Sequence, residues 1–237
     1  MARDSGVTRE GSDAQEVSTP GVDDAAGARP RKRIRPLGVV AAVIAGIAVP
    51  GLLAFGVLAQ SPNTSIDDSL AQGHPARAPA FTLPILQRGI LGNRLERRLA
   101  PALGGQRLSI GALRGVPVVL NIWASWCDPC KQEAALLERT WRTLGRKGGT
   151  LFLGLDQQDL SQDAQGFMRS YRIDYTNVRD QGNDVPMSYG TTGVPETYFI
   201  SARGDVVGHV AGIVSARDLR AGIAAAQAGQ VVGRRSR

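Results

Sequence analysis

The segment from Val116 to Cys130 constrains the fold of this 237-residue chain more than any other part of its sequence. It opens with Val116–Ala124, a near-continuous apolar run rich in β-branched and aromatic residues. Such a run predicts a strand that is buried on both faces, as is typical of a parallel sheet. Two cysteines, Cys127 and Cys130, follow the strand, and apolar residues at helical spacing continue to about Arg146. A buried strand, a pair of cysteines and a helix are therefore predicted in direct succession.

The remainder of the chain alternates between predicted strands and helices. This alternation predicts an α/β fold with a central mixed sheet, parallel at its centre and flanked by helices. In chain order, the other predicted elements are a short strand at Ala80–Leu83 that stops at Pro84, a strand at Thr150–Leu155, a helix at Ser161–Tyr171 with Phe167 and Met168 inward, a short strand or extended link at Asn177–Arg179, a hairpin of Tyr198–Ser201 and Val206–Val210, and a helix that Ser215 caps and that ends at Gln227.

The two cysteines lack the partners that other cysteine-based sites need. A disulfide framework usually has more cysteines, and a tetrahedral zinc site takes four ligands. The only histidines, His74 and His209, lie far from the pair in sequence and are interpreted as exposed or core-edge residues. We therefore predict a redox pair without a metal, although an inert or metal-binding pair is the alternative.

The position of the cysteines at the start of a helix suits disulfide exchange. Free N–H groups and the helix dipole stabilise a thiolate there. We predict that Cys127 is the exposed attacking thiolate and that Cys130 resolves the mixed disulfide. Their redox-active disulfide would be the only cofactor. Pro129 fits the first helical turn because it has no N–H to satisfy there.

The N-terminal part of the chain carries the signs of a membrane anchor. Residues 1–36 are predicted to be a disordered cytoplasmic tail that ends in the basic cluster Arg29–Arg35. Residues 37–59 carry no charge and are enough to cross a bilayer as a helix. The absence of Lys and Arg between this span and Arg77 predicts a single-pass protein of the cell membrane with its domain outside the cytoplasm. A cleavable signal peptide that ends near Ala59 is the alternative.

A linker is predicted at 60–78, one folded domain at 79–229 and a basic tail at 230–237. The net charge of +7 does not predict nucleic-acid binding, because the basic residues are scattered or flank the span. Leucines every four residues predict an additional amphipathic helix that ends near Pro101. It either packs on the domain or contacts a partner or lipid headgroups. These leucines are Leu91, Leu95, Leu99 and Leu103.

Four segments together resemble one known family. They are NIWASWCDPCKQE, APAFTLPIL, LSIGALRGVPVVLN and GTTGVPETYFISARGDVVGHVAG. They are similar to the thioredoxin superfamily, and most closely to the membrane-anchored TlpA/ResA/DsbE-type thiol:disulfide oxidoreductases of bacterial cytochrome c maturation. The resemblance spans about Ala78–Gln227 and implies a thioredoxin-like fold. It also implies disulfide-containing exported proteins such as apocytochrome c as substrates, and a membrane electron donor of the thiol-reductase type.

The resemblance also implies roles for single residues. Trp126 resembles the tryptophan that packs beside the active site, and an ordinary core tryptophan is the alternative. Val194 and Pro195 match the segment that faces the redox pair, where the proline is cis. Glu133 matches a glutamate that is buried near the thiols and tunes their titration, unless it is an exposed first-turn carboxylate. Asp128 either disfavours a neighbouring thiolate or is solvated.

Four functions remain open at the level of the sequence. A reductase of extracytoplasmic disulfides is favoured over an oxidant that installs them. A peroxiredoxin-like peroxidase is disfavoured, because Trp126 and Cys127 stand where a peroxidatic Thr-x-x-Cys pattern would be. A carrier of copper or thiols on the same fold is the non-enzymatic alternative, and retention of metal by the reduced pair would identify it.

Overall fold

The computed structural model describes residues 44–53 and 63–233. Residues 44–53 are helical. Within the described ranges, no helix is both long and apolar enough to cross a membrane. Most of the anchor predicted at 37–59 lies outside these ranges, as do the tail with its basic cluster at 1–36 and residues 234–237. The predicted topology therefore stays a prediction.

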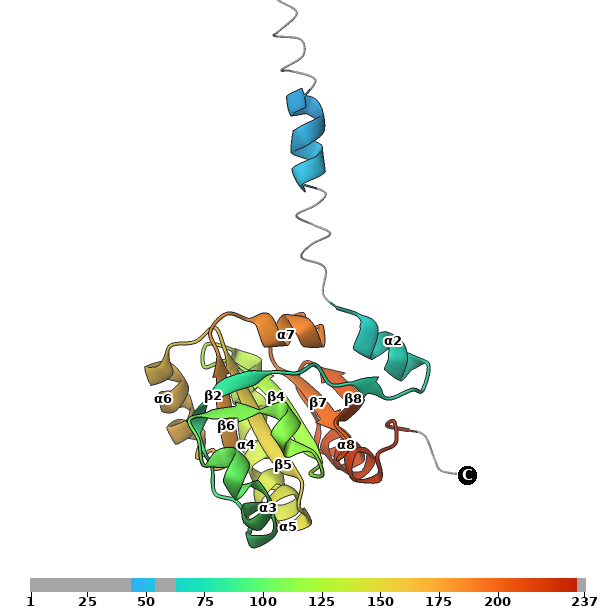
Figure 1. The fold of residues 1–237 in the computed structure, drawn as a ribbon. Coiled ribbons are helices and arrows are strands. Elements are labelled where there is room, and N and C mark those ends of the chain that lie inside the picture. Colours follow the sequence, from blue (N-terminus) through green and yellow to red (C-terminus); the bar gives the residue numbers. More distant parts are fainter. Residues whose placement is uncertain (1–43, 54–62, 234–237) are drawn as a thin grey trace, which may run out of the picture. The chain divides into compact units, whose positions relative to one another are not determined.

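Residues 63–233 form one mixed sheet flanked by helices, as the sequence predicts (Figure 1). Its strand order is β1-β8-β7-β4-β5-β6-β2-β3. The three strands β4, β5 and β6 pair in parallel, and all other pairs are antiparallel. The strands are β1 (Ala76–Arg77), β2 (Thr82–Gln87), β3 (Arg107–Ser109), β4 (Val118–Trp123), β5 (Leu151–Gln157), β6 (Thr176–Asp180), β7 (Glu196–Ile200) and β8 (Asp205–Ala211).

The helices connect these strands and cover the sheet. Ser215 caps the last of them through a capping box with Asp218, which confirms the predicted helix start. The helices are α2 (Ser65–Ala71), α3 (Asn93–Leu103), the 3₁₀ turn η1 (Ile110–Leu113), α4 (Asp128–Thr140), the π-helical turn η2 (Trp141–Gly145), α5 (Arg146–Gly148), α6 (Ser161–Tyr171), α7 (Asp184–Tyr189) and α8 (Ala216–Ala228).

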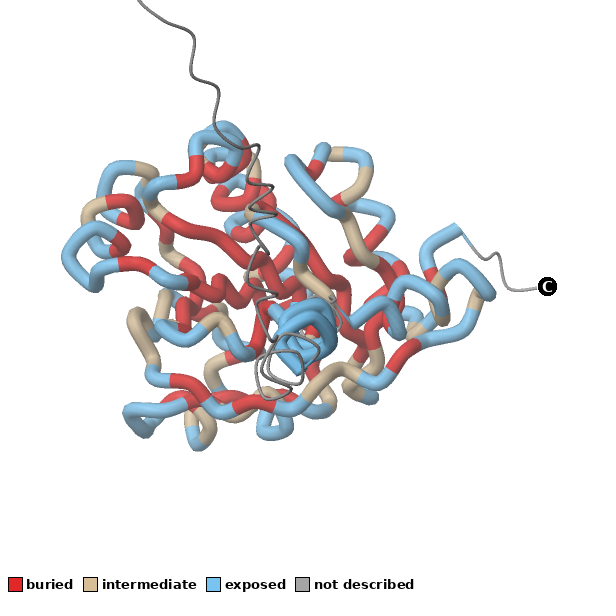
Figure 2. Tube along the Cα trace, turned by 90° about the horizontal axis from the view of Figure 1, so that it is seen from above, coloured by how far each residue is buried: buried red, intermediate tan, exposed pale blue. Residues whose placement is uncertain are grey.

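The central strands form the core because helices cover both of their faces. Every residue of β4 and β5 is buried, and Figure 2 shows buried backbone through the middle of the sheet. The ring of Trp123 stacks on that of Phe167 from α6, with 4.6 Å between the ring centroids. Trp141 is fully buried against Phe152 of β5. Burial of aromatic side chains of this size is the largest source of apolar stabilisation in a domain.

The helix after the cysteines differs from its prediction in one respect. Ala134, Leu137 and Trp141 are buried as expected, but the Leu144 side chain is 41% exposed. Leu144 lies in the π-helical turn η2, where the wider i→i+5 spacing rotates later residues relative to the α-helical face. The helical period used for the prediction therefore fails from this turn onward.

Pro84 does not end the strand that it was predicted to end, whereas helix α3 ends at Leu103, close to Pro101 as predicted. Strand β2 continues through Pro84, and its pairing partner changes there from β3 to β6. A proline lacks the N–H group that would donate a hydrogen bond to a neighbouring strand, and such a residue is tolerated where the pairing changes. Helix α3 contains Pro101 in its last turn. Burial of Leu99 and Leu103 on both sides of this proline holds the turn in place. All four leucines of the predicted amphipathic helix are buried, which confirms that it packs on the domain.

The segment predicted as a linker contains ordered structure. Helix α2 packs on the domain through Ile66, which is 2% exposed, and β1 pairs with β8. His209 of β8 binds Asp67 of α2 through Nδ1 at 2.7 Å, and its Nε2 lies 2.9 Å from Glu196. A short, mostly polar helix has too little periodicity to be recognised in the sequence, so the interpretation of 60–78 as a linker is wrong for residues 65–77.

Replacing Asp67 by asparagine should weaken the docking of α2, and the effect should depend on pH. Despite its burial, hydrogen bonds to Glu196 and Asp67 raise the pKa of His209. The pairing of protonated His209 with Asp67 therefore contributes fully to the free energy of unfolding below the unfolded pKa of histidine, about 6.5. This contribution is lost as the pH rises through the pKa of His209 in the folded protein. Because Asp67 is 60% exposed, we expect a loss of at most about 1 kcal/mol at pH 6 and less at pH 8.

Chemical denaturation at both pH values measures this effect. His209→Gln is the matched control, since Asp67→Asn in that background should have no pH-dependent effect. An equal loss at pH 6 and pH 8 would show that the contact between α2 and the sheet is not ionic.

Candidate active site

Cys127 and Cys130 form a disulfide at the N-terminus of α4. Their sulfurs are 2.12 Å apart. Cys127 is the N-cap residue of the helix, and its Sγ accepts a hydrogen bond of 3.1 Å from the backbone N–H of Cys130. Pro129 occupies the first turn, as predicted. This N–H group and the dipole of α4 favour the thiolate of Cys127 once the disulfide is reduced.

The disulfide is less accessible than predicted. Cys127 is only 4% exposed and Cys130 is 1% exposed. The carbonyl oxygen of Val194 lies 3.4 Å from the Sγ of Cys127. The next peptide bond, between Val194 and Pro195, is cis, which confirms the prediction. The prediction of an openly exposed Cys127 is wrong, because the loop that carries Pro195 covers it; Cys127 is still the more exposed sulfur of the two.

Trp126 stands beside this covered disulfide. Its side chain is 57% exposed, so it is not a core tryptophan. Its Nε1–H points at the backbone oxygen of Gln158, at 3.4 Å, in the loop after β5. Leu160 in the same loop is 69% exposed. Two large apolar side chains therefore face solvent on the segments next to the cysteines.

Asp128 contributes little charge to the sulfurs. It is 82% exposed and pairs with Lys131 at 2.7 Å. The hydrogen bond from Lys131 and its positive charge lower the pKa of Asp128. Of the two interpretations of Asp128, the structure supports a solvated carboxylate. It does not support the role in which Asp128 disfavours a neighbouring thiolate.

Glu133 is buried in α4, three residues after Cys130. It is 1% exposed, and burial raises its pKa to about 7. Its Oε1 accepts a hydrogen bond from Asn121 Nδ2 and its Oε2 accepts one from the backbone N–H of Val214, both at 2.8 Å. These bonds lower the pKa but do not offset the burial. The exposed alternative for Glu133 is therefore excluded, and a group that titrates near neutral pH lies one helical turn from Cys130.

Asn121 connects this carboxyl group to the strand beside Pro195. Its Nδ2 also donates to Thr197 Oγ1 at 3.1 Å, and Thr197 lies two residues after Pro195. The sequence marks Asn121 as the single polar residue inside an otherwise apolar predicted strand. A buried amide at such a position needs hydrogen-bond partners.

The turn before the cysteines is held by a second acidic residue. Asp159 accepts hydrogen bonds from the backbone N–H of Ser125 at 2.6 Å and from its hydroxyl at 2.9 Å. Asp156, at the end of β5, is fully buried near Arg179, whose Nε lies 3.6 Å from its Oδ2. Burial and the charge of Asp159 raise the pKa of Asp156 to about 8. Sequence analysis did not identify any of these residues, because they converge from separate loops and strands.

Replacing Asp159 by asparagine should destabilise the turn that leads to Cys127. The variant loses one acceptor and the negative charge that strengthens the bonds from Ser125, so we expect a loss of about 1–2 kcal/mol in the free energy of unfolding. Asp163→Asn, an exposed carboxylate of α6, makes the same charge change and should cost less. Equal losses in the two variants would show that Asp159 does not hold the turn.

The loop before β7 is held by Glu196. Its Oε1 accepts hydrogen bonds from the backbone N–H groups of Thr192 at 2.8 Å and Gly193 at 3.3 Å. Its Oε2 accepts a bond of 2.7 Å from the hydroxyl of Tyr198. Although burial opposes it, these bonds and His209 lower the pKa of Glu196. An ionised Glu196 thus fixes the loop that places Val194 over the disulfide.

Comparison with known proteins gives one family and several relatives. Residues 76–209 match the model of the AhpC/TSA family. The thiol:disulfide interchange protein DsbE of Pseudomonas fluorescens biotype C is 28% identical over 137 residues, which are 57% of this chain and 65% of the relative. The thiol-disulfide oxidoreductase ResA of Bacillus subtilis (strain 168) is 28% identical over 111 residues, which are 47% of this chain and 62% of the relative. The chain thus spans less than two thirds of the length of either relative.

Solved structures share the fold. A crystal structure from Chlorobium tepidum, described as a thiol:disulfide interchange protein DsbE, superposes with a TM-score of 0.51 at 24% identity. The superposition covers 64% of this chain and 96% of that chain. At this identity the likeness establishes the architecture and leaves the chemistry to the site itself.

Proposed function

Because the chain belongs to the AhpC/TSA family, we propose that it is a thiol:disulfide oxidoreductase whose reacting groups are Cys127 and Cys130. The observation that carries this proposal is the disulfide at the N-terminus of α4, with the Val194 carbonyl 3.4 Å from the Cys127 sulfur. A covered disulfide that faces a fixed loop is suited to exchange with an extended peptide. The DsbE and ResA relatives carry names of the same reaction class.

In the reductive direction, the reaction uses the dithiol form of the pair. The Cys127 thiolate attacks a sulfur of the substrate disulfide, which forms a mixed disulfide and releases the other substrate sulfur as a thiolate. The Cys130 sulfur, as a thiolate, then attacks Cys127, restores the intramolecular disulfide and releases the second substrate thiol. Two electrons pass to the substrate, and the two protons of the pair end on its thiols. Glu133 lies three residues after Cys130 in α4, and we propose that it takes up the proton of Cys130 in this step.

We propose reduction as the physiological direction, and the argument rests on Glu133. An ionised carboxylate buried one helical turn from Cys130 disfavours a thiolate there by like charge. A less stable thiolate removes the stabilisation of the reduced form that makes oxidants of this fold oxidising. Disulfides of exported proteins are then the substrates, apocytochrome c among them, and a membrane electron donor resets the pair. The anchor predicted at 37–59 would place the domain outside the cytoplasm.

Oxidation is the second candidate, because other features of the site favour a thiolate. The Cys130 N–H already points at Cys127 Sγ, and Lys131 neutralises Asp128. A stable thiolate makes the disulfide a better oxidant. The reduction potential distinguishes the two directions.

The reduced full chain should reduce the disulfides of a test protein such as insulin in stoichiometric amounts. A variant with serine at both positions, Cys127→Ser with Cys130→Ser, is the matched control and should leave insulin intact. Mass spectrometry of alkylated thiols measures both. Reduction of insulin by the double variant, or none by the reduced wild type, would contradict the proposed function.

A further inference from the structure

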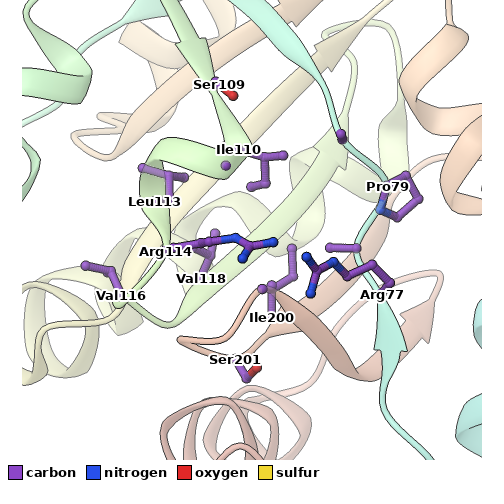
Figure 3. A pocket seen from close by; sticks show the side chains of 14 residues that line it. Arg77, Pro79, Ser109, Ile110, Leu113, Arg114, Val116, Val118, Ile200 and Ser201 are labelled. Atoms are coloured by element: carbon purple, nitrogen blue, oxygen red, sulfur yellow. The ribbon is translucent and has the colours of Figure 1, made fainter.

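A hollow lies at the end of the sheet opposite the cysteines. It has a volume of about 360 Å³ and lies between η1, the start of β4, the end of β7 and the segment after β1 (Figure 3). At this end Val118 pairs with Ile200, whereas Cys127 follows the other end of β4. A strand of six residues is about 20 Å long, so the hollow is separate from the redox site.

The floor of this hollow is apolar and its rim is positively charged. Side chains of Ile110, Leu113, Val118 and Ile200 form much of the lining. Figure 3 shows the guanidinium groups of Arg77 and Arg114 directed toward one another among these apolar side chains. Its volume is within the range of small-molecule sites, which combine an apolar lining with a few convergent polar groups.

The arginines around the hollow have too few carboxylates to neutralise them. No Asp or Glu is among the residues that line the hollow. Asp205 lies 3.7 Å from Arg77 and 3.7 Å from Arg203, too far for a hydrogen bond to either. Within residues 63–233, the Arg114 guanidinium has no hydrogen bond or ion pair. The guanidinium groups of Arg77 and Arg203 thus share one carboxylate, and that of Arg114 has none within residues 63–233. An anion between Arg77 and Arg114 would relieve the repulsion of these two groups.

We propose that this hollow binds a small organic carboxylate with an apolar group, in addition to the redox function of the other site. Arginine recognises a carboxylate through two parallel hydrogen bonds, which a single-atom anion does not match. The apolar part of the ligand would cover the side chains of the floor and exclude water from them. Charge and apolarity together define the ligand class; either feature alone would fit many molecules.

Titration of the purified full chain with 4-methylpentanoate, followed by calorimetry and by NMR of the ligand, tests the proposal. The amide 4-methylpentanamide has the same shape without the charge, and acetate has the charge without the apolar group. We expect saturable binding of 4-methylpentanoate and at least about tenfold weaker binding of both analogues. The amide loses hydrogen bonds to a charged group, which are worth about that factor or more. Acetate loses the apolar burial of four carbon atoms, at about 0.8 kcal/mol for each buried CH₂. Arg114→Gln and Arg77→Gln should each weaken binding by a similar factor.

Insulin reduction by the same variants should be unchanged, which shows that they fold and that the two sites are independent. Absence of binding by the wild type would overturn the proposal, as would equal binding of the amide. Binding of acetate or inorganic phosphate as tight as that of 4-methylpentanoate would also overturn it, because the site would then take any anion. Loss of insulin reduction in the wild type would count against the redox function and not against this site.

Discussion

Cys127→Ser should abolish disulfide exchange, whereas Cys130→Ser should still attack a substrate and then stop. Without the Cys127 thiolate no nucleophile remains at the N-terminus of α4, so we expect the rate to fall by at least about 10³-fold. Without Cys130 nothing resolves the mixed disulfide, which should accumulate. Non-reducing electrophoresis and mass spectrometry of the trapped adduct measure the outcome.

The two serine variants control for each other, because both remove the same internal disulfide. A loss of stability from that removal affects both equally and cannot explain a difference between them. Accumulation of the adduct in Cys127→Ser, with none in Cys130→Ser, would mean that the roles of the two sulfurs are the reverse of those assigned here.

Glu133→Gln should remove a dependence on pH from both stability and exchange. In the folded protein the pKa of Glu133 is about 7, raised from 4.5, so the folded state holds a proton that the unfolded state has released between these values. Glu133 should therefore contribute a fall of about 3 kcal/mol to the free energy of unfolding as the pH rises from 4.5 to 7, in addition to the fall from Asp156, whose pKa is also raised. Glutamine cannot titrate, so this fall should be absent, and the exchange rate should lose its inflection near pH 7.

Denaturation curves and exchange rates at several pH values measure this effect. Asp128→Asn is the matched control, because that carboxylate is 82% exposed and neutralised by Lys131. It should leave both profiles close to those of the wild type. A Glu133→Gln profile that follows the wild type throughout would show that Glu133 does not titrate near the sulfurs in this range.

Strong local patterns made much of the fold predictable. The apolar run at Val116–Ala124 gave β4, because a strand with both faces buried needs no polar alternation. The turn at 202–205 predicted the hairpin of β7 and β8, and Ser215 predicted the start of α8. Each of these signals lies within a few residues of the element that it predicts.

The features that escaped prediction depend on contacts between distant segments. Glu196 holds its loop through residues close to it in sequence, but it also binds His209. His209 in turn binds Asp67 of α2, a helix that was not predicted from the sequence. Asp159 holds the turn before Cys127 across 34 positions. The burial of Cys127 under the Val194 loop is a property of the assembled sheet and not of the Cys-x-x-Cys motif. The carboxylate of Asp128 inside that motif is exposed and pairs with Lys131.

The midpoint potential of the pair tests the central claim most directly. The chain should be equilibrated with glutathione and dithiothreitol buffers at pH 7, and the fraction of dithiol measured after alkylation. A buried carboxyl group one helical turn from Cys130 predicts a potential nearer the reducing value of about −270 mV than the oxidising value of about −120 mV. Because about 30 mV corresponds to about 1.4 kcal/mol, these two outcomes differ by about 7 kcal/mol and are easily separated. A potential more reducing than about −220 mV agrees with a reductase, and one above about −170 mV would contradict it and make the protein an oxidant.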